Sequence, residues 1–173
     1  MIKEENSIKE KVFITHKNPD RKYEGLITYG DRDILLPKDA LISITLGEKF
    51  SVWRTIVNGI VSQFVMKQMK KSPKLLYAEM KGNIKEGYGL TMTVWESNSM
   101  KQFRDNGAHK FAMRFFSWIF YRGNAHAYFL SYKNNGSIPT SAEAFDLVKK
   151  YGRFYDNGNL IRHSRAPKFN VEV

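Results

Sequence analysis

The order in which two hydrophobic periodicities follow one another between residues 40 and 132 most constrains what this chain can fold into. The run 40–46 (ALISITL) is apolar and rich in β-branched residues, which predicts a buried strand. Residues 51–71 then place apolar side chains three and four positions apart, which predicts an amphipathic helix. The runs 75–80 and 88–95 predict two more strands. In the second of them apolar residues alternate with threonine, so one face is apolar and the other is mixed.

The rest of this region repeats the change of period. A second helix is predicted from Ser97 to Phe120, with an interruption at Asn106-Gly107, and residues 124–132 (NAHAYFLSY) predict a fourth strand. This β-α-β-β-α-β order is that of the split βαβ, ferredoxin-like arrangement. The sequence therefore predicts an α+β fold with a four-stranded antiparallel sheet and two helices on one face.

Segments on either side extend this unit. Residues 1–39 are polar and rich in turns, which predicts an N-terminal arm or hairpin. A C-terminal helix is predicted over 141–151, opened by a capping box and closed by Gly152. We therefore expect a ferredoxin-like domain over 40–152, followed by a basic tail over 153–173.

Composition excludes several kinds of protein. At 173 residues, of which 42% are hydrophobic, the chain is long enough and apolar enough to bury a core. It contains no cysteine, so disulfides, thiolate metal sites and a cysteine nucleophile are excluded. The charged N-terminus has no apolar segment, and no run reaches the length of a membrane helix. We therefore expect a cytoplasmic protein that does not associate with a membrane.

The formal net charge of +11 has two explanations. It would attract polyanions or acidic ligands, but the basic residues are spread along the chain, as they are on any lysine-coated surface. The aromatic RNP1 pattern of RNA-binding sheets is absent from the predicted central strands. Nucleic-acid binding is therefore a third hypothesis and is not favoured.

A four-stranded sheet with helices on one face leaves its other face bare. The remaining apolar segments are too few to cover that face, whereas a second copy of the chain would cover it. We therefore expect a homodimer in which the two sheets pack face to face.

The segment 94–114 (VWESNSMKQFRDNGAHKFAMR) resembles the dimeric α+β barrel superfamily, in particular its antibiotic-biosynthesis-monooxygenase-like branch. The long helix that begins at Val52-Trp53 and stops before Pro73 is similar in layout to that of the spheroidene monooxygenase family. The resemblance covers about residues 41–132 and implies a homodimer with one pocket in each protomer. Such families include cofactor-free oxygenases of polyketide quinols, haem-degrading oxygenases and proteins without demonstrated activity.

Two histidines are candidate catalytic residues. His109 follows Asn106-Gly107 where a helix restarts, and a neutral imidazole there could act as a base or as an axial ligand. The alternative for His109 is a bond to a local carbonyl or to Glu96. His126 lies between two alanines in the fourth strand, which leaves room for a ligand beside its ring.

Apolar and aromatic side chains are the candidate ligand contacts, and ordinary core packing is the alternative for each. The predicted contacts are Trp53, Phe64, Trp95, Met113, Phe116 and Tyr128. No spacing of His, Asp and Glu predicts a metal site. No cofactor is required by the sequence, and haem is the one that the resemblance allows.

The first hypothesis is therefore a monooxygenase-like enzyme that binds a small apolar or planar ligand and oxidises it without flavin. The alternative is a non-catalytic dimeric domain that binds such a ligand or haem.

Overall fold

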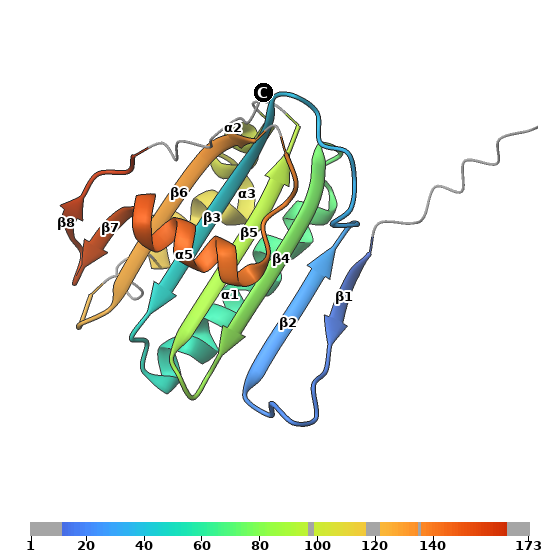
Figure 1. Ribbon diagram of the computed structural model, residues 1–173. Helices are drawn as coiled ribbons and strands as arrows, with labels where there is room; N and C mark the ends of the chain where they lie inside the picture. The colour runs from blue at the N-terminus through green and yellow to red at the C-terminus, as the bar shows by residue number, and fades with distance from the viewer. Residues whose placement is uncertain (1–11, 97–98, 117–121, 135, 166–173) are drawn as a thin grey trace, which may run out of the picture.

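The computed structural model describes residues 12–96, 99–116, 122–134 and 136–165. Over these residues, eight strands form one antiparallel sheet in the order β1-β2-β4-β5-β3-β6-β7-β8 (Figure 1). The predicted α+β class is confirmed, and the predicted four-stranded sheet is wrong. The strands are β1 (Phe13–His16), β2 (Glu24–Tyr29), β3 (Ala40–Glu48), β4 (Leu75–Asn83), β5 (Tyr88–Trp95), β6 (His126–Asn134), β7 (Arg153–Asp156) and β8 (Asn159–Arg162). The helices are α1 (Val52–Lys70), α2 (Ser99–Arg104), α3 (Gly107–Phe111), the π-helical turn η1 (Ala112–Phe116) and α5 (Ser141–Tyr151).

The strands that the sequence predicts lie side by side at the centre of the sheet, in the order β4-β5-β3-β6. Hairpin β1–β2 extends this centre beyond β4, and hairpin β7–β8 extends it beyond β6. The turn of the second hairpin holds Asn157 at φ 48° and Gly158 at φ 79°, as a two-residue hairpin loop requires. This turn carries a clear signal in the sequence. The strands on either side of it have only four residues each and are too short to show a period.

Helix α5 lies across the apolar face of the central strands (Figure 1). Its buried Ala144 and Val148 pack into one cluster with Ile42, Ile44 and Met92 of the sheet. The sequence analysis left this face for a second copy of the chain. The premise of a bare face is wrong, because the predicted C-terminal helix covers it.

A buried carboxylate anchors the start of α5 to the sheet. Glu79 of β4 is 4% exposed and accepts hydrogen bonds from the Tyr77 hydroxyl at 2.6 Å, from Ser141 and from Arg32. Burial, and then the bond to Glu79, raise the pKa of Tyr77 to about 12. One side chain thus joins α5, β4 and the segment before β3.

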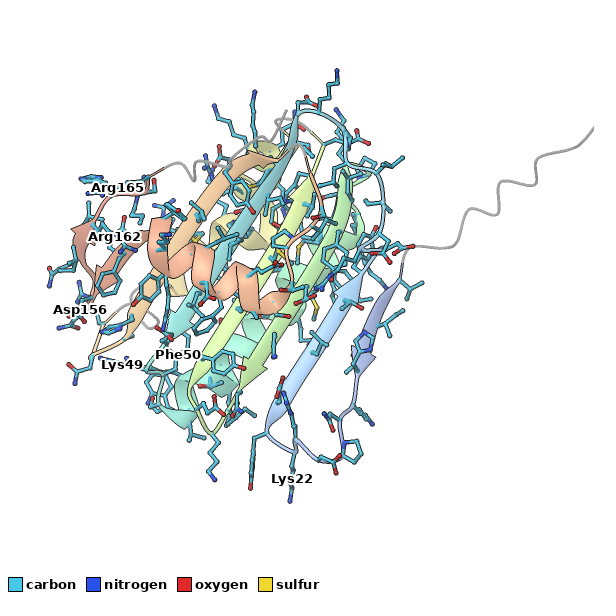
Figure 2. The ribbon with its side chains drawn as sticks, viewed as in Figure 1. Lys22, Lys49, Phe50, Asp156, Arg162 and Arg165 are labelled. Carbon is cyan, nitrogen blue, oxygen red and sulfur yellow. The ribbon has the colours of Figure 1, made fainter. Side chains whose placement is uncertain are left out.

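The end of α5 is held by the second hairpin. Gly152 ends the helix as predicted, and a Cβ added there would lie 2.3 Å from the carbonyl oxygen of Val148. Arg162 of β8 donates a hydrogen bond of 3.0 Å to the carbonyl of Gly152 and another to that of Lys149 (Figure 2). A guanidinium at a helix C-terminus also complements the helix dipole.

The opposite face of the sheet is covered by α1, α2 and α3 (Figure 1). A second apolar cluster joins Met66 and Met69, near the end of α1, to Leu75, Trp95 and Phe103. Nearer its start α1 has no fully buried side chain. The space between helix and sheet is therefore filled at one end only.

Replacing Glu79 by alanine should lower the free energy of unfolding by about 2–4 kcal/mol, because buried donors lose their acceptor and Arg32 loses its counter-charge. Urea unfolding followed by circular dichroism measures this loss. Glu96→Ala is the matched control at an exposed position. Equal stability of the two variants would contradict an anchoring role for Glu79.

Candidate functional site

A cavity of about 680 Å³ lies between the sheet and the helices α1, α2 and α3. This size is within the range of small-molecule sites in proteins. The sequence analysis predicts a pocket in this layer of the fold.

Hydroxyl side chains form most of the floor of the cavity, and Met80 and Phe129 from the same sheet complete it. The hydroxyl side chains alternate along the strands, as Ser43 and Thr45 do on β3 and Thr91 and Thr93 on β5, so all point to one face of the sheet. The register places Ser43 opposite both Thr93 and Ser131. The hydroxyls of Ser131 and Ser43 are 3.1 Å apart. The hydroxyl part of the floor is therefore a band of small hydrogen-bonding groups across three neighbouring strands.

The roof is mainly apolar. Helix α1 contributes Val61, Val65 and Met69, together with the polar Asn58 and Ser62. The segment from α2 to η1 contributes Met100, Phe103, Ala112 and Met113. A ligand between floor and roof would meet hydroxyl groups on one side and aliphatic, thioether and aromatic groups on the other.

The charged side chains in the described lining are both basic. Arg104 enters from α2 and Arg153 from β7, and the described lining includes no Asp or Glu. Arg104 also forms an ion pair of 2.9 Å with Asp105, which offsets part of its charge. The lining therefore favours an anionic or hydrogen-bond-accepting group on a ligand over a cationic one.

His109 lies in the cavity wall, where it is half-buried. Its Nδ1 is 3.2 Å from the carbonyl oxygen of Arg104, so Nδ1 carries the proton and donates it to that bond. Burial lowers the pKa of His109, which keeps the ring neutral at pH 7. Nε2 is thus left with a lone pair that can accept a proton or a hydrogen bond.

Gln68 of α1 holds His109 and its helix in place. Its side-chain amide donates to the carbonyls of Phe103 at 3.1 Å and Asn106 at 2.9 Å, and its carbonyl accepts from the backbone N–H of His109 at 2.8 Å. Gly107 is at φ 58°, and a Cβ there would lie 2.9 Å from the Gln68 side chain. The interruption at Asn106-Gly107, visible in the sequence, separates α2 from α3. At this break the Gln68 side chain of α1 is hydrogen-bonded to both helices.

Trp95 packs below this region in the core and does not line the cavity. It is 1% exposed, and its ring centroid is 4.9 Å from that of Phe103, which is in turn 4.9 Å from the His109 ring. Its indole Nε1 is buried without a hydrogen-bond partner. Trp95 therefore supports the wall through Phe103, and its predicted contact with a ligand stays a prediction.

His126 and Tyr128 lie on β6 outside the cavity lining, which takes Phe129, Leu130 and Ser131 from the same strand. The ring of Tyr128 stacks on Phe154 with centroids 4.6 Å apart, and His126 is 3.3 Å from the carboxylate of Asp156. The structure therefore does not bring the two predicted catalytic histidines together.

Of the remaining predicted ligand contacts, one lines the cavity and two do not. Met113 lines the cavity, whereas Trp53 and Phe64 lie on the outer face of α1 and are more than half exposed. The side chain of Phe116 is outside the described part of the chain. The hydroxyl floor, Gln68, Arg104 and Arg153 were not predicted from the sequence. The Thr91 and Thr93 alternation was the signal that could have found the floor.

Within the described residues, no group of three or more His, Asp or Glu side chains could hold a metal ion. No described helix has the length and apolar character needed to cross a bilayer. Comparison of the chain with models of protein families, with curated proteins and with solved structures gives no match. The resemblance to dimeric α+β barrels therefore stays a prediction.

His109 should make the stability of the protein depend on pH. Its pKa in the folded state is below the ordinary value of 6.5, so the unfolded state binds more protons just below that pH. The free energy of unfolding should therefore fall as the pH drops from about 7 to about 5, and His109→Gln should lose less over this window. Urea unfolding at both pH values measures this, with His163→Gln at an exposed position as the control. Equal losses in wild type and His109→Gln would contradict it.

Proposed function

We propose that this chain binds a small molecule with an apolar or planar body and an anionic or hydrogen-bonding end in the cavity beneath α1. The observation that carries the proposal is the chemistry of the lining. It combines an apolar roof, a hydroxyl floor and basic groups without a described acidic residue. A few placed polar groups in a largely apolar pocket are what orient a bound ligand.

The arrangement of the central strands supports kinship with dimeric α+β barrels. The four central strands, in the order β4-β5-β3-β6, have α1 and the segment of α2 and α3 on one face, which is compatible with such a core inside the larger eight-stranded sheet. The homodimer implied by that kinship would have to use a surface other than the apolar sheet face under α5. Sedimentation of the purified chain tests for this dimer.

A second candidate function is oxidation of the bound molecule without flavin, and the neutral His109 ring in the cavity wall favours it. The substrate class is a reduced ring system with an acidified CH₂ group. Nε2 of His109 would remove a proton from this carbon, and the resulting carbanion would react with dioxygen. One oxygen atom would become the new carbonyl oxygen, and the other would leave as water with the two hydrogens lost from the carbon. Atoms and electrons then balance without a further reductant.

Haem is the cofactor that the resemblance allows, and the residues of the wall fit it. The Nδ1–H of His109 is donated to a backbone carbonyl, which leaves Nε2 as the metal-binding nitrogen. Arg104 and Arg153 would pair with the haem carboxylates. When bound, haem would supply one-electron and oxygen chemistry.

Filling the cavity should abolish binding of an apolar anionic probe. We expect Thr45→Phe to weaken the binding of anilinonaphthalene sulfonate about tenfold or more, because the new ring occupies the space above β3. Fluorescence titration measures the change. Thr15→Phe, at an exposed position on β1, is the control for the same substitution in a strand. Probe binding that is unchanged in Thr45→Phe would place the binding elsewhere and contradict the proposal.

The role of His109 separates the two candidates. Oxygen uptake with a panel of reduced polycyclic quinols should fall about a hundredfold or more in His109→Gln if His109 is the base, while probe binding persists. Titration with haem should give a Soret shift in wild type that His109→Gln lacks if His109 is an iron ligand. Probe binding without turnover or a Soret shift would leave the binding proposal and remove the oxidation candidate.

A further inference from the structure

The outer face of α1 presents a continuous apolar stripe to solvent. Val52, Ile56, Ile60 and Phe64 recur every four residues, and Trp53 lies beside the first of them. The exposed fraction of these five residues lies between 49% and 59%. At the rise of an α-helix, the stripe is about 18 Å long.

This stripe is not part of the core. The cavity and the apolar clusters use the other side of α1, through Val57, Val61, Val65 and Met69. Single exposed apolar residues are ordinary, but a contiguous row of them marks a surface that binds something. Nearby, Phe111 of α3 and Met113 of η1 are also 54% and 41% exposed.

The helices around the stripe carry most of the net charge of the protein. Residues 52–71 and 99–116 contain eight Lys or Arg and one acidic residue, Asp105, and thus hold seven of the eleven net positive charges. Seven of these basic side chains are exposed: Lys67, Lys70, Lys71, Lys101, Arg104, Lys110 and Arg114. Exposed basic side chains therefore lie on the same group of helices as the stripe, and one of them, Arg104, also lines the cavity.

We propose that the outer face of α1 docks on the surface of an anionic lipid bilayer. The stripe would enter the headgroup region, and the lysines around it would lie against lipid phosphates. Aromatic and basic groups are already paired here, because Arg54 lies 5.4 Å from the ring centroid of Trp53 and Lys67 lies 5.8 Å from that of Phe64. Trp and Phe next to Lys and Arg suit the boundary between acyl chains and headgroups.

Charge and chemistry favour a bilayer over two other occupants. A second copy of the chain would bring two strongly cationic faces together, which like-charge repulsion opposes. A nucleic acid would satisfy the lysines and could stack bases on Trp53 and Phe64, but the aliphatic remainder of the stripe offers bases neither stacking nor hydrogen bonds. The sequence predicts no association with a membrane because it lacks a spanning segment, and peripheral docking needs none. The proposal is also independent of what the cavity binds.

Flotation with lipid vesicles tests the proposal on the full chain. We expect the protein to float with vesicles in which about a third of the lipid is phosphatidylserine, and to stay behind with pure phosphatidylcholine. Ile60→Asp should reduce the bound fraction about tenfold, because a carboxylate replaces a side chain that enters the bilayer. Ile161→Asp is the matched control, since Ile161 is an equally exposed isoleucine on β8, 59% against 56%. A double Lys70→Glu, Lys71→Glu variant should lose binding although every residue of the stripe is kept.

Three outcomes would overturn the proposal. The first is absence of wild-type binding to anionic vesicles, and the second is binding by Ile60→Asp at the level of Ile161→Asp. The third is a dimer in solution, without lipid, that Ile60→Asp dissociates, which would assign the stripe to a second copy. If the first outcome holds and the protein instead binds RNA in a salt-sensitive way that Ile60→Asp does not change, the basic side chains form a nucleic-acid surface.

Discussion

The two faces of strands β3, β5 and β6 differ in chemistry, and the rest of the structure depends on this difference. One face presents Ile42, Ile44 and Met92, which are fully buried against α5. Over the cavity the other face presents mainly serine and threonine, with Phe129 of β6, and hydroxyl side chains offer little apolar area to a covering helix. The first face therefore supports a packed core and the second supports a cavity, although both belong to the same three strands.

The same difference explains where the polar anchors lie. On the packed side, Glu79 and Arg162 fix the two ends of α5, so that helix has little freedom to move. On the cavity side, α1 is held to the core near its C-terminal end by Met66 and Met69, and to α3 by Gln68. The helices over the cavity therefore rest on few buried contacts, and His109 is positioned by the Gln68 side chain at its backbone N–H and by the Arg104 carbonyl at its ring.

Many of the strands and helices were predictable from the sequence, because they depend on the spacing of apolar residues along a short segment. The alternation of Leu90, Met92 and Val94 with threonine identified the strand and its two faces, and the interruption at Asn106-Gly107 placed His109 at a helix start. The partner of each face was not predictable. Nothing local in residues 141–151 shows that α5 crosses back over the sheet. The apolar face that α5 covers was therefore predicted to pack against a second protomer. Likewise, alternation along β6 shows that His126 lies on the sheet face away from the cavity only once the pairing of β6 with β3 is known.

The hydrogen bonds of Gln68 also bear on where the cavity could open to solvent. Separating α1 from the break between α2 and α3 would break three hydrogen bonds at once, so an opening of the cavity between these helices is disfavoured. The other boundary of the cavity is the rim at Arg153, Tyr155 and Gly158, which belongs to a short hairpin at the side of the sheet. If the cavity binds an anion as proposed, this rim offers the entrance that leaves α1 in place, and Arg153 is the basic group at it.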